Sequence, residues 1–437
     1  MKKKKKFIGS VFLLEVIALV IILLYAGVYF KGMKEDGALD PAKQTIARNS
    51  ANVDTEDTQV ISEADNTQEQ AAGPEEDMKA TGVIGEGDTS EGDIGEGYSG
   101  EGDIGEGDAG NTEDTQNSED GTEAGNNGGS VTPGDVFDTI TISAAGDVTL
   151  GRDSDYGYTG SFDDEFELQG KDYGYFFRNV KAIFEADDLT IVNLETTLTK
   201  AKDPAVKKFR FKADPSYVEI LKQGDIEVVS VANNHSLDYL EQGYDDTIAT
   251  LKEAGVGYFG FDNKYITDIR GIKLGILGYE CWKSSQEQKD TISQDIKGMK
   301  EEGADLVIVM FHWGIERDYY PYSVQTEIAH FTIDSGADLV LGSHPHVLQG
   351  IEEYHGKNIF YSLGNFSFGG NKNPADKDTM VVVYKFNFKN GELVSHHSEV
   401  VPCSISSVKD RNNYQPTPLK DSELARVIEK INKYSVY

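Results

Sequence analysis

The chain has 437 residues and a formal net charge of −34, with 75 Asp and Glu against 41 Lys and Arg. A balance this acidic argues against nucleic acid as a partner, because the phosphate backbone repels it. Only two cysteines occur, Cys281 and Cys403, without zinc-finger spacing, so a thiolate metal site is disfavoured. Whether the two cysteines pair is left open by the sequence.

The first 30 residues predict a membrane anchor. A basic tail, residues 1–6, precedes an almost wholly apolar segment, residues 7–30, which is long enough to cross a bilayer as a helix. A cleaved signal peptide is the alternative, but the apolar run is longer than an h-region and no small-x-small cleavage site precedes Lys31. The lysines indicate a cytoplasmic N-terminus, so we expect a single-pass protein whose residues after 34 lie outside the cell.

A low-complexity acidic segment comes next. Residues 35–130 hold 26 Asp and Glu against 3 Lys and Arg, and units such as IGEGD recur. With few aromatic residues and strong charge repulsion, such a segment cannot bury enough apolar surface to fold. We therefore expect residues 31–137 to form a disordered, acidic, Gly-rich linker. Weak calcium binding by the repeats is an alternative, although they lack the regularity of a nonapeptide calcium repeat.

The remaining residues, 138–437, are long enough for one large domain in which strand-like and helix-like segments alternate. Apolar runs predict strands at 140–145, 188–195, 225–235, 271–279, 305–314, 338–341 and 357–366, and helical patterns occupy 241–254 and 324–335. A hairpin within 379–397 is expected to turn at Asn390-Gly391, and an amphipathic helix to start at Glu423. This alternation predicts α/β architecture.

Polar side chains of types that bind metal ions lie at or just past the ends of five of the apolar runs. They are Asp147, Glu195, Asn234, His235, His312, His344 and His346. Ligands of open α/β sheets bind at the carboxyl edge of the strands, so we expect these side chains to lie together. His344 and His346 flank Pro345, and an extended backbone there would point both imidazoles to one side.

Carboxylate, amide oxygen and imidazole are ligands for a divalent metal of the Mn, Fe or Zn type. A carboxylate can bridge two such ions, and two ions together can activate a water and neutralise a phosphoryl group. An imidazole that is not bound to metal could then protonate the leaving oxygen. The sequence therefore predicts a site for one or two divalent metal ions.

Six ordered motifs support a family resemblance. They are GDVTLGR (146–152), NLE (193–195), ANNHSLD (232–238), FHWG with Glu316 (311–316), GSHPHVLQ (342–349) and SLGNFSF (362–368). They resemble the CapA family of poly-γ-glutamate capsule synthesis proteins, within the calcineurin-like metallophosphoesterase superfamily, over nearly all of residues 140–370. The resemblance implies a metallophosphatase-like, four-layer α/β/β/α sandwich of two mixed sheets.

The resemblance also implies a role for each polar residue. The metal ligands would be Asp147 and His346 at a first position, Asn234, His312 and His344 at a second, and Glu195 as a bridge between them. His235 would contact the substrate, and Asp238 would orient His235 through its other ring nitrogen.

One departure from the superfamily pattern concerns the first metal. Thr149 stands where these phosphoesterases usually have a histidine, so that position loses an imidazole. Arg152 could bind an anionic group of the substrate, or form an ordinary surface salt bridge. Glu316 is expected to support the site rather than only face solvent, Trp313 to pack, and Asn365 to shape the site.

Three functions are compatible with these residues. The first is a metal-dependent, phosphoesterase-like hydrolase acting on a phosphoester or an amide at the bacterial cell membrane. The second is a non-catalytic assembly subunit of a polyglutamate synthase-exporter, and the third is a polymer-binding or sensing module. The His235–Asp238 pair favours the first function, whereas Thr149 and the family resemblance favour the second. The implied partners are the membrane, other synthase-exporter subunits, and an anionic polymer or phosphoester substrate.

Overall fold

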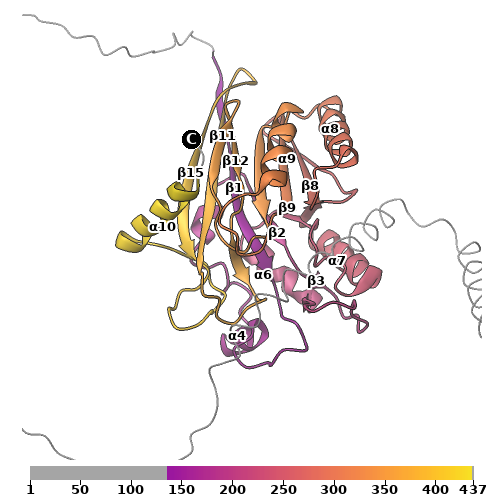
Figure 1. Cartoon of the computed structure of the whole chain (residues 1–437), viewed down its shortest axis with the longest axis vertical. Coiled ribbons are helices and arrows are strands. Elements are labelled where there is room, and N and C mark those ends of the chain that lie inside the picture. Colours follow the sequence, from indigo (N-terminus) through magenta and orange to yellow (C-terminus); the bar gives the residue numbers. More distant parts are fainter. Residues whose placement is uncertain (1–134, 436–437) are drawn as a thin grey trace, which may run out of the picture. The chain divides into compact units, whose positions relative to one another are not determined.

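The computed structural model describes residues 135–435, which are the coloured part of Figure 1. The predicted basic tail (1–6), membrane helix (7–30) and most of the predicted linker (31–137) lie outside the described residues. Within residues 135–435, no helix combines the length and the apolar character that crossing a bilayer requires. The first strand begins at Phe137, one residue before the domain boundary expected at 138.

The first sheet is built around β1 (Phe137–Thr149), which has parallel partners in β2 (Leu189–Leu194) and β13 (Asn365–Phe368). Further strands give the order β16-β15-β14-β1-β2-β5-β6. Their bounds are Val228–Ser230 for β5, Gly257–Phe259 for β6, Asp378–Lys389 for β14, Glu392–Ser404 for β15 and Thr417–Pro418 for β16. β1, β2, β5 and β6 run parallel, so their carboxyl ends meet at one edge.

The second sheet has the order β11-β12-β10-β9-β8-β7. Its strands are β7 (Tyr265–Ile269), β8 (Ile272–Cys281), β9 (Leu306–Trp313), β10 (Leu339–Ser343), β11 (Ile351–Tyr354) and β12 (Lys357–Phe360). The central strands β8, β9, β10 and β12 are parallel. Every residue of β9 is buried, as expected for a parallel strand covered on both faces.

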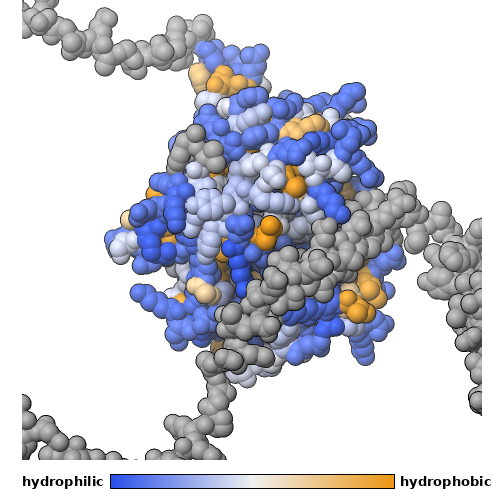
Figure 2. Space-filling model, viewed as in Figure 1, coloured by the Kyte–Doolittle hydropathy of each residue, from blue (hydrophilic) through white to orange (hydrophobic). Residues whose placement is uncertain are grey.

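The two sheets pack face to face. Ile142 of β1 and Ile191 of β2 share one apolar cluster with Ile276 of β8 and Ile308 of β9. Burial of such aliphatic side chains stabilises the fold by about 1.5–3 kcal/mol each. Most of the face shown in Figure 2 is hydrophilic, consistent with apolar side chains gathered in buried clusters.

Helices cover the outer faces of both sheets. The first sheet carries α4 (Phe162–Leu168), α5 (Lys181–Phe184), α6 (Val218–Gln223) and α7 (Leu240–Ala254), and the second carries α8 (Gln286–Glu301) and α9 (Ser323–Asp334). Figure 1 shows α8 and α9 beside β8 and β9. The last helix, α10 (Asp421–Tyr434), adds Val427 and Ile431 to the cluster between the sheets. A short η2 helix (Pro215–Tyr217) and a β3 (Thr197–Leu198)–β4 (Lys212–Ala213) ladder complete the fold.

The mixed α/β prediction is confirmed, and so is the hairpin, since β14 and β15 turn at Asn390 and Gly391 with φ of 53° and 83°. Two predicted strands differ in extent from the strands that the structure shows. The run 225–235 forms only the three residues of β5 before the chain turns, and 357–366 divides into β12 and the start of β13. Cys281 and Cys403 are free and buried, in separate apolar clusters.

Candidate metal centre

The first sheet delivers oxygen ligands to its carboxyl edge. Asp147 lies near the end of β1, Glu195 directly follows β2, and Asn234 lies in the loop after β5. Gly146 allows β1 to reach this position, because a Cβ there would lie 1.8 Å from the carbonyl oxygen of Gly364. At the same contact the amide of Asp147 donates to that carbonyl at 3.0 Å.

The second sheet delivers three imidazoles. His312 lies in β9, and His344 and His346 follow β10. The expected extended backbone at this pair is wrong: φ is 93° at His344 and 56° at His346, in the left-handed region. Such conformations cost on the order of 1–3 kcal/mol and persist where surrounding structure imposes them. Here the turn directs both imidazoles toward the first sheet.

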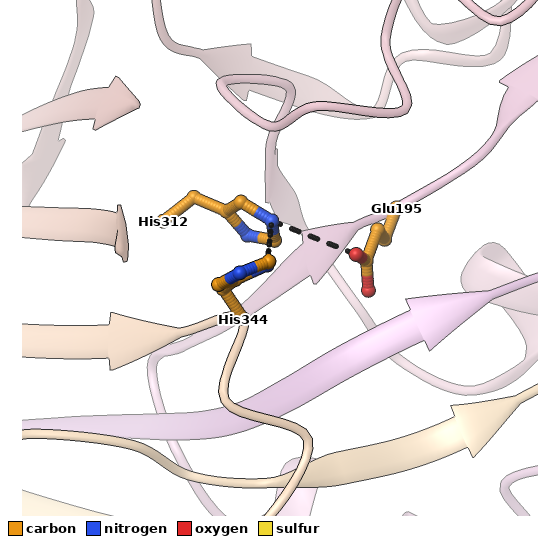
Figure 3. Close-up of side chains that lie close together, drawn as sticks. All are labelled: Glu195, His312 and His344. Atoms are coloured by element: carbon orange, nitrogen blue, oxygen red, sulfur yellow. Dashed lines mark hydrogen bonds and ion pairs between the residues drawn. The ribbon is translucent and has the colours of Figure 1, made fainter. Parts of the chain in front are cut away.

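Glu195, His312 and His344 form one potential metal-binding group, with ligand atoms within 4.8 Å of one another. Figure 3 shows the three side chains pointing toward one another. His312 Nε2 lies 3.5 Å from Glu195 Oε1 and 3.1 Å from His344 Nδ1. The amide oxygen of Asn234 lies 3.0 Å from the same His312 nitrogen. Four potential ligands, a number that suits a divalent ion, therefore converge.

Asp147, Glu195 and His346 form a second group of the same kind. His346 Nδ1 lies 3.2 Å from Asp147 Oδ2, and His346 Nε2 lies 3.9 Å from Glu195 Oε1. Asn365 holds this imidazole through its side-chain oxygen, 2.9 Å from His346 Nδ1. Glu195 is common to both groups, which is the arrangement that a bridging carboxylate would have.

Glu195 supplies the structural test of whether a metal fits. The residue is fully buried, and among the described residues neither carboxylate oxygen has a hydrogen-bond partner. A buried carboxylate without partners is costly, and metal coordination is a common way to satisfy it. The donors around it are carboxylate, amide and imidazole, which suit Mn, Fe or Zn. The residues present fit one or two divalent ions.

The protonation of the histidines differs between the two groups. Burial lowers the pKa of His312 and His344 well below the usual range, so both imidazoles are neutral and able to bind metal at pH 7. Burial also opposes charge on His346, but Glu195 and Asp147 outweigh it and raise its pKa to about 10. Burial raises the pKa of Glu195 well above its usual range. Metal entry between Asp147 and His346 must therefore displace a proton.

Ser343 contacts Nδ1 of His312, a role that sequence reasoning did not assign. Its hydroxyl donates to the carbonyl of Phe311 at 3.0 Å and lies 3.0 Å from His312 Nδ1. With its hydrogen engaged, the hydroxyl is placed to accept from Nδ1–H, which is the tautomer in which Nε2 can bind a metal ion, and Asn193 Nδ2 lies 3.2 Å from the same Nδ1. Asn193 holds the Asp147 carboxylate in place by donating to its Oδ1 at 2.9 Å. Ser343 directly precedes the predicted ligand His344, and Asn193 lies two residues before Glu195, so their positions could have indicated both residues from the sequence.

His235 and Asp238 form a buried pair beside Glu195. Asp238 Oδ2 lies 2.7 Å from His235 Nδ1, and His235 Nε2 lies 3.9 Å from Glu195 Oε1. Burial lowers the pKa of His235, although Asp238 opposes the shift. Lys207 was not predicted to take part, yet its ammonium group lies 2.9 Å from Asp238 Oδ1. His235 therefore presents Nε2 toward the metal-binding groups, while Asp238 holds its Nδ1.

Arg152 does not join these groups through any contact described for it. Its guanidinium lies 3.1 Å from Asp163 Oδ2 and donates to the carbonyl oxygens of Asp153 and Tyr156. These contacts match the salt-bridge alternative. Glu316 is exposed and acts on the site through its charge, which helps to raise the pKa of His346.

Thr149 is fully buried, and its hydroxyl has no hydrogen-bond partner among residues 135–435. Trp313 is also buried, and it packs as expected, donating to the carbonyl of Tyr361 at 2.9 Å. The tryptophan at the site is instead Trp282, just after β8, whose ring stands edge-on to His344 at 4.6 Å. Its position directly after the apolar run of β8 could have indicated this role from the sequence.

The carboxyl edges of the two sheets thus hold a buried histidine–carboxylate centre beside the oriented imidazole of His235. This arrangement defines an α/β protein with a candidate divalent-metal centre. The family model described as "Bacterial capsule synthesis protein PGA_cap" matches residues 141–370, and the chain belongs to this family.

Curated relatives agree with this assignment. The chain is 31% identical to "PGA biosynthesis protein CapA" of Bacillus subtilis, over 68% of this chain and 79% of the relative. It is 29% identical to "Capsule biosynthesis protein CapA" of Bacillus anthracis, over 65% and 74%. A "Probable polyglutamine synthesis accessory protein" of Mycobacterium tuberculosis is 27% identical, over 57% and 73%.

Among solved structures, a hypothetical protein from Thermus thermophilus matches with a TM-score of 0.38 and 17% identity, covering 60% of this chain and 99% of that chain. A phosphatase from Mycoplasma pneumoniae matches with a TM-score of 0.36 and 14% identity, covering 61% and 95%. Because both scores are below 0.5, the description of the fold rests on the two packed sheets themselves.

Proposed function

We propose that the chain is a metal-dependent hydrolase of capsule or poly-γ-glutamate synthesis, cleaving a phosphoester or amide bond. The domain would be a metallophosphatase-like, four-layer α/β/β/α sandwich held outside the bacterial cell membrane by residues 7–30 and the acidic linker. The relatives named for capsule and PGA biosynthesis support the process. The donor set around Glu195 supports the chemistry.

The observation that carries hydrolysis is the oriented imidazole of His235. Asp238 holds Nδ1 at 2.7 Å, so the free Nε2 faces the side of the centre on which Glu195 lies. A divalent ion in this centre would supply a water of lowered pKa and neutralise negative charge. As the imidazolium, His235 would give its Nε2 proton to the leaving atom, and Asp238 would stabilise that charged form by accepting from Nδ1–H.

The test is a screen of purified full-length protein with Mn²⁺, Fe²⁺ or Zn²⁺ against bis(p-nitrophenyl) phosphate and γ-glutamyl amides. His235→Ala should lower turnover by roughly 10²–10⁴-fold, the usual range for general acid catalysis. Metal content should stay near that of the unmodified chain, since His235 is not assigned as a ligand. His330→Ala is the matched control, because His330 is partly exposed on α9 and its Nε2 lies 2.9 Å from Glu352 Oε1. Full activity in His235→Ala would contradict the proposal.

Thr149 favours a second candidate, a non-catalytic assembly subunit. Its buried hydroxyl, which lacks a partner among the described residues, replaces an imidazole that the resemblance would place at the first metal. A protein that binds metal firmly but cleaves no bond with any of the three ions would be this subunit. Its partners would be other polyglutamate synthase-exporter subunits. Thr149→His should then raise metal content without producing activity.

The location is proposed from residues 1–30. Protease added to intact protoplasts should digest the domain or release it, whereas a cytoplasmic marker protein should stay intact. Complete protection of the C-terminal residues would contradict both the proposed topology and the proposed site of action.

A further inference from the structure

A stretch of thirteen residues carries a positive charge that contrasts with the rest of the chain. Residues 200–212, KAKDPAVKKFRFK, contain six Lys and Arg against one Asp, whereas the whole chain has a net charge of −34. We call residues 200–212 the basic loop. A concentration of one sign of charge beside a site raises the local concentration of oppositely charged ligands.

The inner side of the basic loop is fastened to the candidate centre. The amide of Ala205 donates to the carbonyl of Asp238 at 2.9 Å. Lys207 joins both parts of the site, since its ammonium group lies 2.9 Å from Asp238 Oδ1 and donates to the carbonyl of Asn234 at 2.7 Å. The ring of Phe211 lies 4.4 Å from that of His235. A ligand held by the loop would therefore lie next to the proton donor.

The outer side of the same loop faces solvent. Lys200, Lys202 and Lys208 are exposed, although Lys200 also lies 3.7 Å from Asp214 Oδ2, and Val206 is 99% exposed. Phe209 adds a ring to this side, with the Lys208 ammonium 5.0 Å from its centroid. The three exposed lysines are spread over nine residues of the loop, and lysine acts as a flexible point charge. Such a surface suits many carboxylates along a chain better than one small anion.

We propose that the basic loop is the docking surface for an acidic polyamide, a polymer with a carboxylate on each repeating unit. Lys200, Lys202 and Lys208 bind successive carboxylates, and Phe209 and Val206 pack against the apolar parts of the polymer between them. The fastened inner side then presents a neighbouring bond of the polymer to His235. This inference rests on the proposed function and adds the surface through which the polymer is held.

The experiment measures the affinity of the full-length protein for fluorescently labelled poly-γ-glutamate at 50 mM and at 500 mM salt. Replacing Lys200, Lys202 and Lys208 together by Gln should weaken binding roughly tenfold at 50 mM salt, because each exposed ion pair contributes about a factor of two. The difference should shrink at 500 mM salt, where exposed charges are screened. Metal content should match that of the unmodified chain, which shows that the variant is folded.

The control replaces Lys252, Lys273 and Lys297 by Gln. These lysines are also exposed, and they lie on α7, β8 and α8 toward the ends farther from the centre. The control has the same change in net charge and should bind the polymer as the unmodified chain does. Equal affinity of the loop variant and the unmodified chain, or equal losses in both variants, would overturn the inference.

Failure of the inference and failure of the proposed function give different results. If the unmodified chain cleaves a substrate in a His235-dependent way while the loop variant binds polymer normally, only the docking surface is wrong. If polymer binding depends on the loop but no bond is cleaved with any metal, the docking surface stands and the hydrolase proposal falls.

Discussion

Replacing Glu195 by Gln should change stability in opposite directions with and without metal. In metal-free protein the carboxylate is fully buried and has no hydrogen-bond partner among residues 135–435. Because burial raises the pKa of Glu195, folding at neutral pH must either bury its charge or take up a proton, and the amide of Gln avoids both costs. The substitution should therefore raise the free energy of unfolding by about 1–3 kcal/mol. For a domain of this size, Tm would rise by about 2–6 °C.

With metal the sign should reverse. Glu195 belongs to both potential metal-binding groups, so Gln removes an anionic ligand from each. Loss of even an indirect supporting contact weakens metal binding by about 10–100-fold. Loss of a direct ligand should weaken binding further, by about 1,000-fold, which lowers the stabilisation by bound metal by about 4.1 kcal/mol and so exceeds the gain of about 1–3 kcal/mol expected without metal. The variant should therefore melt below the unmodified chain when Mn²⁺ or Zn²⁺ is in excess.

The assay is thermal unfolding of the full-length protein, followed by circular dichroism, in EDTA and in excess metal. Glu353→Gln is the control, because Glu353 is exposed on β11 and should leave Tm unchanged in both conditions. A shift of the same sign for Glu195→Gln with and without metal would refute the reasoning, since it would show that no ion engages the carboxylate.

Three further predictions concern positions around the sheets. Ser343→Ala should weaken metal binding about 10–100-fold, since Nδ1 of His312 loses its acceptor; an unchanged affinity in a metal titration would contradict this. Gly146→Ala should cost about 3 kcal/mol or more in chemical denaturation, because its Cβ would lie 1.8 Å from the Gly364 oxygen, and stability equal to the unmodified chain would exclude that contact. Burial raises the pKa of Glu227 to about 7, so the folded protein binds its proton more tightly than the unfolded chain does, and this contribution to stability is lost as pH rises from about 4.5 to 7. Glu227→Gln should therefore gain about 1–2 kcal/mol relative to the unmodified chain over that interval, after allowance for its partial exposure; a difference independent of pH would argue against the shift.

The mixed α/β fold could be predicted because apolar runs and turn residues are local signals. β9 is fully buried and reads as an uninterrupted apolar run, and the turn at Asn390 and Gly391 needs residues that tolerate positive φ. Polar residues at the ends of β1 and β2 were expected to lie together because parallel strands of one sheet end at a common edge. The structure brings these particular residues together.

Features that depend on contacts distant in sequence could not be predicted. The turn at His344 and His346 is held by tertiary contacts, such as the amide of Arg317 donating to the Pro345 carbonyl at 2.8 Å. The local preference next to Pro345 favours an extended backbone, and these contacts override it. Lys207 reaches the centre from a segment with no metal-ligand pattern, so only the folded chain shows its part in the site.

The claim that Glu195 joins two unequal metal-binding groups is tested most directly by metal content. Full-length protein, His344→Ala and Asp147→Ala would be incubated with Mn²⁺, Fe²⁺ or Zn²⁺, dialysed and analysed by mass spectrometry for metal per chain. We predict nearer one than two ions for the unmodified chain, because Thr149 adds no imidazole to the group of Asp147 and His346. His344→Ala should lose more metal than Asp147→Ala. No bound metal, or equal metal in all three proteins, would contradict the account.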